Sequence, residues 1–131
     1  MSAPGPEAQA ISAFVPILRS FEEEQTRDFY LRYLGFEIAF EHRFGPGMPL
    51  YMGVRLGGLE LHLSEHHGDA TPGSAVRIEM TDIATYHRSI RERGHPRADP
   101  GLQDQEWGWR ELPVTDPSGN RLIFCSPLAA T

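Results

Sequence analysis

A carboxylate and an imidazole lie two positions apart in the most regular part of the sequence. Residues 59–63 read Leu-Glu-Leu-His-Leu, which is the alternation of a β-strand with one apolar face. Residues of one parity share a face of a strand, so we expect Glu60 and His62 side by side. Such a carboxylate is able to bind a cationic group of a ligand, to act as a general base, or to pair with Arg55 or Arg77. The sequence leaves these alternatives open.

The neighbouring polar residues do not complete a metal site. His66 and His67 follow in a polar loop, and no spacing typical of a metal site occurs. We therefore expect no metal and no cofactor; a variant metal site, if present, would use Glu60 and His62. Cys125 is the single cysteine, and we expect it to be a buried apolar side chain in a reducing compartment, the cytoplasm.

The secondary-structure pattern that must position these residues occurs twice. An apolar strand at 14–18 precedes a helix that begins with a capping box of Ser20 and Glu23 and ends at Gly35. Strands follow at 36–40, 50–55 and 59–63. The order then starts again with a strand at 75–80, a helix capped by Thr81 or Asp82 that ends at Gly94, strands at 109–114 and 121–125, and between these two strands a turn at 116–120.

Two copies of strand–helix–strands, offset by roughly 60 residues, indicate a repeated supersecondary unit. With 131 residues, the chain has the size of one domain of roughly 100–200 residues. We predict an α+β domain over residues 13–127 with modules at approximately 13–64 and 74–127. Residues 1–12 are expected to form a flexible N-terminal tail and residues 128–131 a short C-terminal one.

Charge and hydropathy exclude two classes of partner. The net charge is −6, which repels polyphosphates, so we expect no nucleic-acid partner. The apolar runs are shorter than the ~18 residues of a membrane span, so we expect no membrane partner. The first ten residues have neither the basic start nor the apolar centre of a signal peptide.

Several motifs in this order resemble those of the vicinal oxygen chelate superfamily, which includes glyoxalases, extradiol dioxygenases and bleomycin-resistance proteins. The bleomycin-resistance branch is the most similar. The residues that carry the resemblance are Phe29-Tyr30, Leu34-Gly35-Phe36, the segment 57–64, Trp107-Gly108 with Arg110-Glu111, and Asp116-Pro117-Ser118-Gly119-Asn120.

The resemblance implies a cupped mixed sheet of two βαβββ modules, in a homodimer whose ligand sites are shared between subunits. The metal positions of the superfamily correspond to Val15, Glu60, Val76 and Ile123, of which only Glu60 is able to bind a metal. Arg77 and Glu79 would then lie on the outer face. The implied ligand-binding residues are Val15, Phe40, Tyr51, Glu60, His62, Val76, Trp107 and Ile123.

These expectations predict a small-molecule-binding protein of the bleomycin-resistance type. It would hold an antibiotic or similar amphipathic ligand in a dimer cleft without changing it chemically. One alternative is a metal-dependent enzyme of the glyoxalase or dioxygenase kind with an altered ligand set. Another is an interaction module whose cup is filled by its own side chains.

Overall fold

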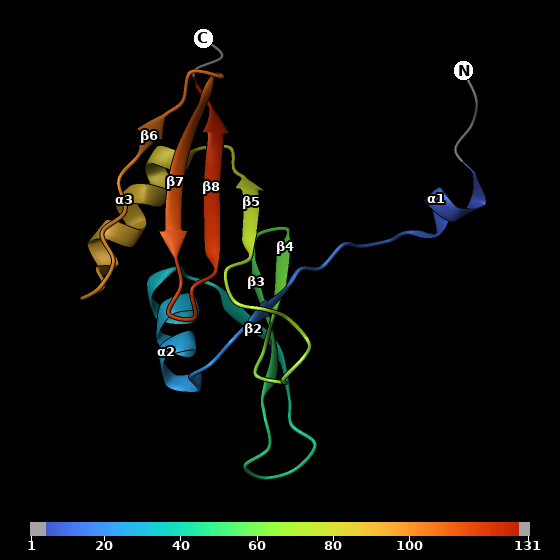
Figure 1. The fold of residues 1–131 in the computed structure, drawn as a ribbon. Helices are drawn as coiled ribbons and strands as arrows, with labels where there is room; N and C mark the ends of the chain where they lie inside the picture. The colour runs from blue at the N-terminus through green and yellow to red at the C-terminus, as the bar shows by residue number, and fades with distance from the viewer. Residues whose placement is uncertain (1–4, 129–131) are drawn as a thin grey trace.

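The computed structural model describes residues 5–128 (Figure 1). The first module contains β1 (Ile17–Arg19), α2 (Glu23–Arg27), the π-helical segment η1 (Asp28–Tyr33), β2 (Glu37–His42), β3 (Tyr51–Leu56) and β4 (Leu59–Ser64). The second contains β5 (Ala75–Glu79), α3 (Ile83–Arg93), β6 (Gln103–Asp104), β7 (Trp109–Thr115) and β8 (Arg121–Pro127). A short helix, α1 (Pro6–Ala10), precedes both modules.

The two modules have the same topology. Their sheets have the strand orders β1-β4-β3-β2 and β5-β8-β7-β6. In each sheet the first strand of the module pairs with the last in parallel, and the other pairs are antiparallel. A parallel pair of strands requires a crossover connection. In the first module α2 and η1 form this connection, and in the second module α3 forms it. The predicted α+β fold of two βαβββ modules is confirmed.

Each sheet has one face covered by helices and one open face. In β4, Leu61 and Leu63 are buried against the helices, while Glu60 and His62 lie on the open face with their β3 partners Arg55 and Gly53. The alternation of residues 59–63 therefore gave the correct separation of faces, because side chains of successive residues point to opposite sides of a strand.

The register of the second sheet corrects one expectation. Val76 pairs with Leu122 and Arg77 pairs with Ile123. Leu122 is buried in the core, so Val76 points to the helices, whereas Arg77 and Ile123 share the open face. The expectation that Val76 and Ile123 share a face, with Arg77 on the outer one, is wrong by one residue, and a shift of one residue exchanges the faces of a strand.

The core is shared by the two modules because their helices lie against each other. Buried Phe29, Tyr30 and Tyr33 of η1 belong to the same apolar cluster as Ile90 of α3 and Phe124 of β8. Polar contacts also join the modules. The Tyr30 hydroxyl donates to Asp116 Oδ2 at 2.6 Å, and the Tyr86 hydroxyl donates to the Leu34 carbonyl at 2.7 Å.

Of the two predicted helix starts, that of α3 is confirmed and that of α2 is wrong. Asp82 caps α3 by accepting from the Thr85 amide, as one of the two predicted alternatives. The predicted capping box of Ser20 and Glu23 does not form, because Ser20 is buried and its hydroxyl bonds that of Thr26. The cap of α2 is instead Glu22, which accepts from the Glu24 amide.

The segment before β1 extends away from the body of the molecule and carries α1 at its far end (Figure 1). This helix buries no residue, and Ile11 and Phe14 are 74% and 90% exposed. Residues 1–4 and 129–131, which belong to the two predicted tails, lie outside the described residues. Within residues 5–128, no helix combines the length and the apolar character needed to cross a membrane.

Candidate functional site

Four of the predicted ligand-binding residues come together on the open face of the first sheet. We call Phe40, Tyr51, Glu60 and His62 the open-face cluster. They come from three adjacent strands: Phe40 from β2, Tyr51 from β3, and Glu60 and His62 from β4. The register places Gly53 between Phe40 and His62.

A chain of hydrogen bonds crosses this cluster. Nε2 of His62 lies 2.7 Å from Oε2 of Glu60, and Nδ1 of His62 lies 2.7 Å from the Tyr51 hydroxyl. A carboxylate only accepts, so Nε2 of His62 donates to Glu60, and Nδ1 forms the hydrogen bond with the Tyr51 hydroxyl. The two ring nitrogens are therefore both used within the cluster.

The charge of Glu60 is matched inside the protein. Its other oxygen accepts from Nε of Arg55 at 3.0 Å. The hydrogen bond from His62, with that from Arg55, lowers the pKa of Glu60 below its ordinary value, so the carboxylate is ionised at neutral pH. Among the alternatives for Glu60, the structure shows the one in which the carboxylate pairs with Arg55.

Aromatic rings form the floor of the cluster. The rings of Phe40 and Tyr51 are nearly parallel, with 6.1 Å between centroids and 16° between planes, and Phe40 meets the His62 ring edge-on at 5.0 Å. Phe40 is 38% exposed, so its ring is open to a ligand. A Cβ at Gly53 would overlap the Phe40 ring; the missing side chain at position 53 is what lets this ring lie on the sheet.

A β-bulge brings Phe40 to this face. Ile38 pairs with Val54, but Phe40 pairs with Gly53, so Ala39 is an extra residue in β2. Without the bulge, Phe40 would have the same parity as Ile38 and would point to the helix-covered face. Bulges change the direction of side chains in this way and often occur near binding sites.

Three other predicted residues lie outside this group of four side chains. Val15 precedes β1 at the base of the N-terminal segment, and Ile123 lies on the open face of the second sheet, beside Arg77. Trp107 is 65% exposed in the turn between β6 and β7. The structure does not bring Trp107 and Ile123 to the open-face cluster, whereas Val15 lies beside β4, because the carbonyl of Pro16 accepts from the His62 amide at 3.0 Å.

A second group of side chains, which the sequence did not predict, lies on the open face of the second sheet. Arg77 lies over the Trp109 ring at 5.0 Å from its centroid and pairs with Glu111 at 2.6 Å, which also accepts from Gln105. Buried Cys125 pairs with Glu111 in the sheet. The alternation of Trp109 and Glu111 in their strand was the available signal, because it places both residues on one face.

The donor set does not fit a divalent metal ion. Glu60 and His62 bond each other and are further bonded by Arg55 and Tyr51, and the corresponding face of the second sheet presents Ile123 and the cation Arg77. A divalent ion needs several free oxygen or nitrogen donors and no adjacent cation. Within the part of the chain that the structure describes, no group of three His, Cys, Asp or Glu side chains is arranged to hold a metal.

The comparisons with known proteins agree with this fold. A family model described as "Glyoxalase superfamily protein" matches residues 7–130. The chain belongs to the glyoxalase superfamily. The comparison with curated proteins found no match.

Several solved structures of bleomycin-binding and bleomycin-resistance proteins resemble the chain. A bleomycin-binding protein from the bleomycin producer Streptomyces verticillus, complexed with copper(II)-bleomycin, is 32% identical, with a TM-score of 0.64 over 87% of this chain and 94% of that chain. A second bleomycin-binding protein, complexed with bleomycin, is 26% identical, with a TM-score of 0.67 over 88% and 98% of the two chains. The bleomycin resistance determinant of transposon Tn5 shares the fold at 24% identity and a TM-score of 0.70, over 91% and 100% of the chains.

Proposed function

We propose that this glyoxalase-superfamily protein binds a small amphipathic molecule of the bleomycin type and holds it without chemical change. The open-face cluster is the centre of the proposed site. Its exposed Phe40 ring lies beside a carboxylate, an imidazole and a phenol whose positions are fixed by mutual hydrogen bonds. A site of preorganised aromatic and polar groups binds a ligand with little loss of conformational freedom.

The proposal assigns no chemical step to these groups. Burial raises the pKa of the Tyr51 hydroxyl, so the phenol stays protonated at neutral pH and serves as a hydrogen-bond donor. Glu60 has its charge matched by Arg55 and accepts a hydrogen bond from His62. Groups held in this way orient a ligand by contact, in keeping with sequestration.

We further propose that a second copy of the chain completes the cleft. In one chain the open-face cluster forms a floor without an opposite wall. The N-terminal segment carries exposed Ile11 and Phe14, and Ile17 on the open face is 41% exposed; adjacent exposed apolar side chains of this kind mark interaction surfaces. A homodimer would bring Trp107 and Ile123 within reach of the ligand.

The test is calorimetric titration of metal-free bleomycin into the protein and into Phe40→Ala. We expect a one-to-one complex per subunit and a loss of about tenfold or more in affinity for Phe40→Ala, because a stacked aromatic ring contributes about 1 kcal/mol or more. Phe44→Ala is the matched control, since Phe44 is 77% exposed in the loop between β2 and β3. Equal affinities for the two variants would refute the proposed site.

Two further measurements separate binding from catalysis. Mass spectrometry of bleomycin after long incubation is expected to recover it unchanged. Titration of Zn²⁺, Ni²⁺, Mn²⁺ and Fe²⁺ into the protein alone is expected to show no stoichiometric binding. Stoichiometric binding that is lost in Glu60→Gln would contradict this expectation. Turnover lost on adding a chelator would establish the metal-dependent alternative.

We propose the cytoplasm as the compartment, because Cys125 is a buried free thiol.

A further inference from the structure

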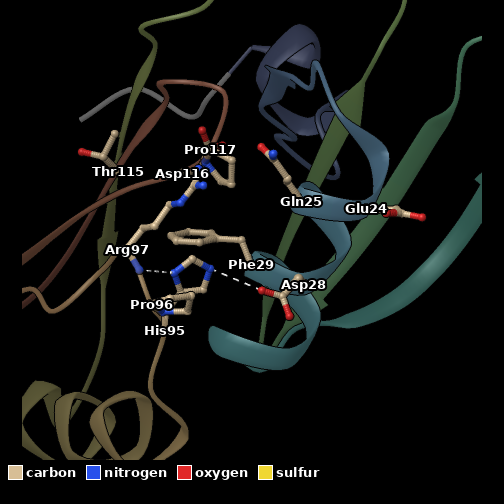
Figure 2. Close-up of a pocket in the computed structure, with 10 residues that line it drawn as sticks. All are labelled: Glu24, Gln25, Asp28, Phe29, His95, Pro96, Arg97, Thr115, Asp116 and Pro117. Atoms are coloured by element: carbon tan, nitrogen blue, oxygen red, sulfur yellow. Dashed lines mark hydrogen bonds and ion pairs between the residues drawn. The ribbon is translucent and has the colours of Figure 1, made fainter.

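A cavity of about 580 Å³ is lined by residues of the helical segments and of two loops, which Figure 2 shows. It lies between the modules: α2 and η1 form one wall, and the loop after α3 and the turn between β7 and β8 form the other. No residue of the open-face cluster lines it. Its volume suits a small organic molecule, and the walls come from one chain, so it needs no second copy.

The wall beside η1 is aromatic and rigid. Phe29 is buried, and the His95 ring meets it edge-on at 5.4 Å between centroids. Nδ1 of His95 accepts from the Arg97 amide at 3.1 Å, and Nε2 lies 3.3 Å from Oδ2 of Asp28. A ring fixed on both nitrogens has little freedom to lose when a ligand binds. Pro96 and Pro117 contribute further rigid apolar surface.

Two of the acidic side chains at the cavity are held by ion-pair or hydrogen-bond partners within the protein. Asp28 pairs with Arg32 at 2.6 Å, and this contact lowers the pKa of the carboxyl. Asp116 accepts from the Tyr30 hydroxyl, the amides of Ser118 and Asn120, and the Asn120 side chain. The remaining acid, Glu24, points away from the cavity (Figure 2).

One cation at the cavity lacks a partner. The Arg97 side chain extends along the cavity toward Pro117, and the Gln25 amide is directed to the same space from α2 (Figure 2). Within residues 5–128, no carboxylate lies within ion-pair distance of the Arg97 guanidinium; its backbone amide alone is engaged, with His95. The guanidinium and the amide are both hydrogen-bond donors near an aromatic wall. They are suited to a planar ligand that packs on this wall and carries an acceptor group.

We propose that this cavity is a second binding site, specific for a small aromatic carboxylate. The ring of the ligand would pack on Phe29, His95 and the proline surface, and its carboxylate would accept from Arg97, with Gln25 as a further donor. A singly charged carboxylate fits better than a doubly charged phosphate, because Arg97 is the single arginine among the residues that line the cavity. The site is independent of the proposed bleomycin-type site.

The test is an NMR titration of the ¹⁵N-labelled protein with 2-naphthoate, compared with uncharged 2-naphthamide. We expect saturable shifts at the amides of Gln25 and Arg97 and at the His95 ring for 2-naphthoate, and binding weaker by about tenfold or more for the amide, since it lacks the charged hydrogen bond. Arg97→Gln should weaken 2-naphthoate to the level of the amide. Arg88→Gln, which changes an exposed arginine of α3 outside the cavity, should bind as the unchanged protein does.

Three results would overturn the proposal: the same affinity for 2-naphthoate and 2-naphthamide, no loss in Arg97→Gln, or shifts at Phe40 and His62 in place of the cavity residues. Binding of 2-naphthoate that does not saturate at a ligand concentration of about 10 mM would also overturn it, because specific binding has a dissociation constant below roughly this concentration. The thermal midpoints of both variants, measured without ligand, show that they are folded. Titration of Arg97→Gln with metal-free bleomycin should be unaffected, which keeps the two proposed sites distinguishable.

Discussion

Asp116 is a charged side chain with 4% exposure that accepts four hydrogen bonds. A buried carboxylate is stable only when such donors replace water. Three of the donors come from the turn that follows it, whereas Tyr30 comes from the other module. The sequence indicated the turn from its Pro and Gly residues, but the bond to Tyr30 depends on how the two modules meet.

Tyr30→Phe should therefore destabilise the protein by about 1.5–3 kcal/mol, the usual contribution of a hydrogen bond to a charged group. Urea denaturation measures this free energy of unfolding. Tyr33→Phe is the matched control, because it removes a phenol from the same segment without depriving a buried carboxylate of a donor. Similar losses in the two variants would show that Asp116 does not depend on Tyr30.

Gly53→Ala tests the floor of the proposed ligand site. The new methyl group would displace the Phe40 ring and so separate it from Tyr51 and His62. We expect bleomycin affinity to fall by about tenfold and the ring-proton shifts of His62 to change in NMR spectra. Gly58→Ala should leave both unchanged, because a Cβ at Gly58 meets open space. Unaltered binding by Gly53→Ala would mean that Phe40 has no part in the site.

At the scale of elements, one buried hydroxyl bonds the start of α3 to its sheet. Ser126 of β8 accepts from the Ile83 amide at 3.0 Å and donates to the Met80 carbonyl at 2.8 Å. The Ile83 amide belongs to the first turn of α3, where amides have no partner within the helix. Ser126 thus fixes where this helix starts relative to β8, together with the Asp82 cap.

Ser126→Ala should cost about 1–3 kcal/mol, because it removes the partner of a buried amide and of a partly buried carbonyl. The loss is to be measured by urea denaturation, with protection of α3 amides followed by hydrogen exchange. Ser74→Ala, at a hydroxyl with one exposed bond to Thr71, provides the comparison. If α3 retained its protection in Ser126→Ala, the Asp82 cap alone would be sufficient to hold the helix start.

At the scale of the whole molecule, titratable groups define a pH range of stability. Hydrogen bonds from arginine or histidine lower the pKa values of Glu23, Asp28, Glu60 and Asp104. A lowered carboxyl pKa stabilises the fold above about pH 4 and loses this contribution as the pH falls through the folded value. Burial raises the pKa values of the four phenols, Tyr30, Tyr33, Tyr51 and Tyr86, whose contribution is lost above about pH 10.

We expect the free energy of unfolding to be nearly constant between about pH 5 and pH 9 and to fall on both sides. Denaturation followed across this range measures it. Added salt should have little effect on the loss of stability at high pH, because that loss arises from burial of the tyrosines. Salt should reduce the contribution of the exposed carboxylate pairs, because it screens their charges. Stability that rose above pH 10 would contradict the burial of the tyrosines.

The proposed dimer is a prediction at the same scale. Light scattering should give twice the chain mass of 14.7 kDa. Phe14→Ser removes the most exposed apolar side chain of the N-terminal segment and should shift the protein toward monomer, with weaker bleomycin binding. Phe21→Ser, at an exposed ring that stacks on Arg19 of its own chain, should not. A monomer with full affinity would place the whole site in one chain.

The sequence by itself determined the repeated strand–helix–strands pattern and the faces of β4, and it limited the cap of α3 to Thr81 or Asp82, because alternation and capping act over a few neighbouring residues. The family resemblance implied the two complete βαβββ modules. The same resemblance, taken position by position, also led to Phe40, Tyr51, Glu60 and His62. Only the tertiary structure decided that a bulge at Ala39 turns Phe40 to the open face, that Arg77 and not Val76 accompanies Ile123, and that Ser20 bonds Thr26 and does not cap α2. The register of one strand on another depends on packing between distant segments, and a shift of one residue reverses every side chain. For the same reason, the cavity at Arg97 forms only where the two modules meet.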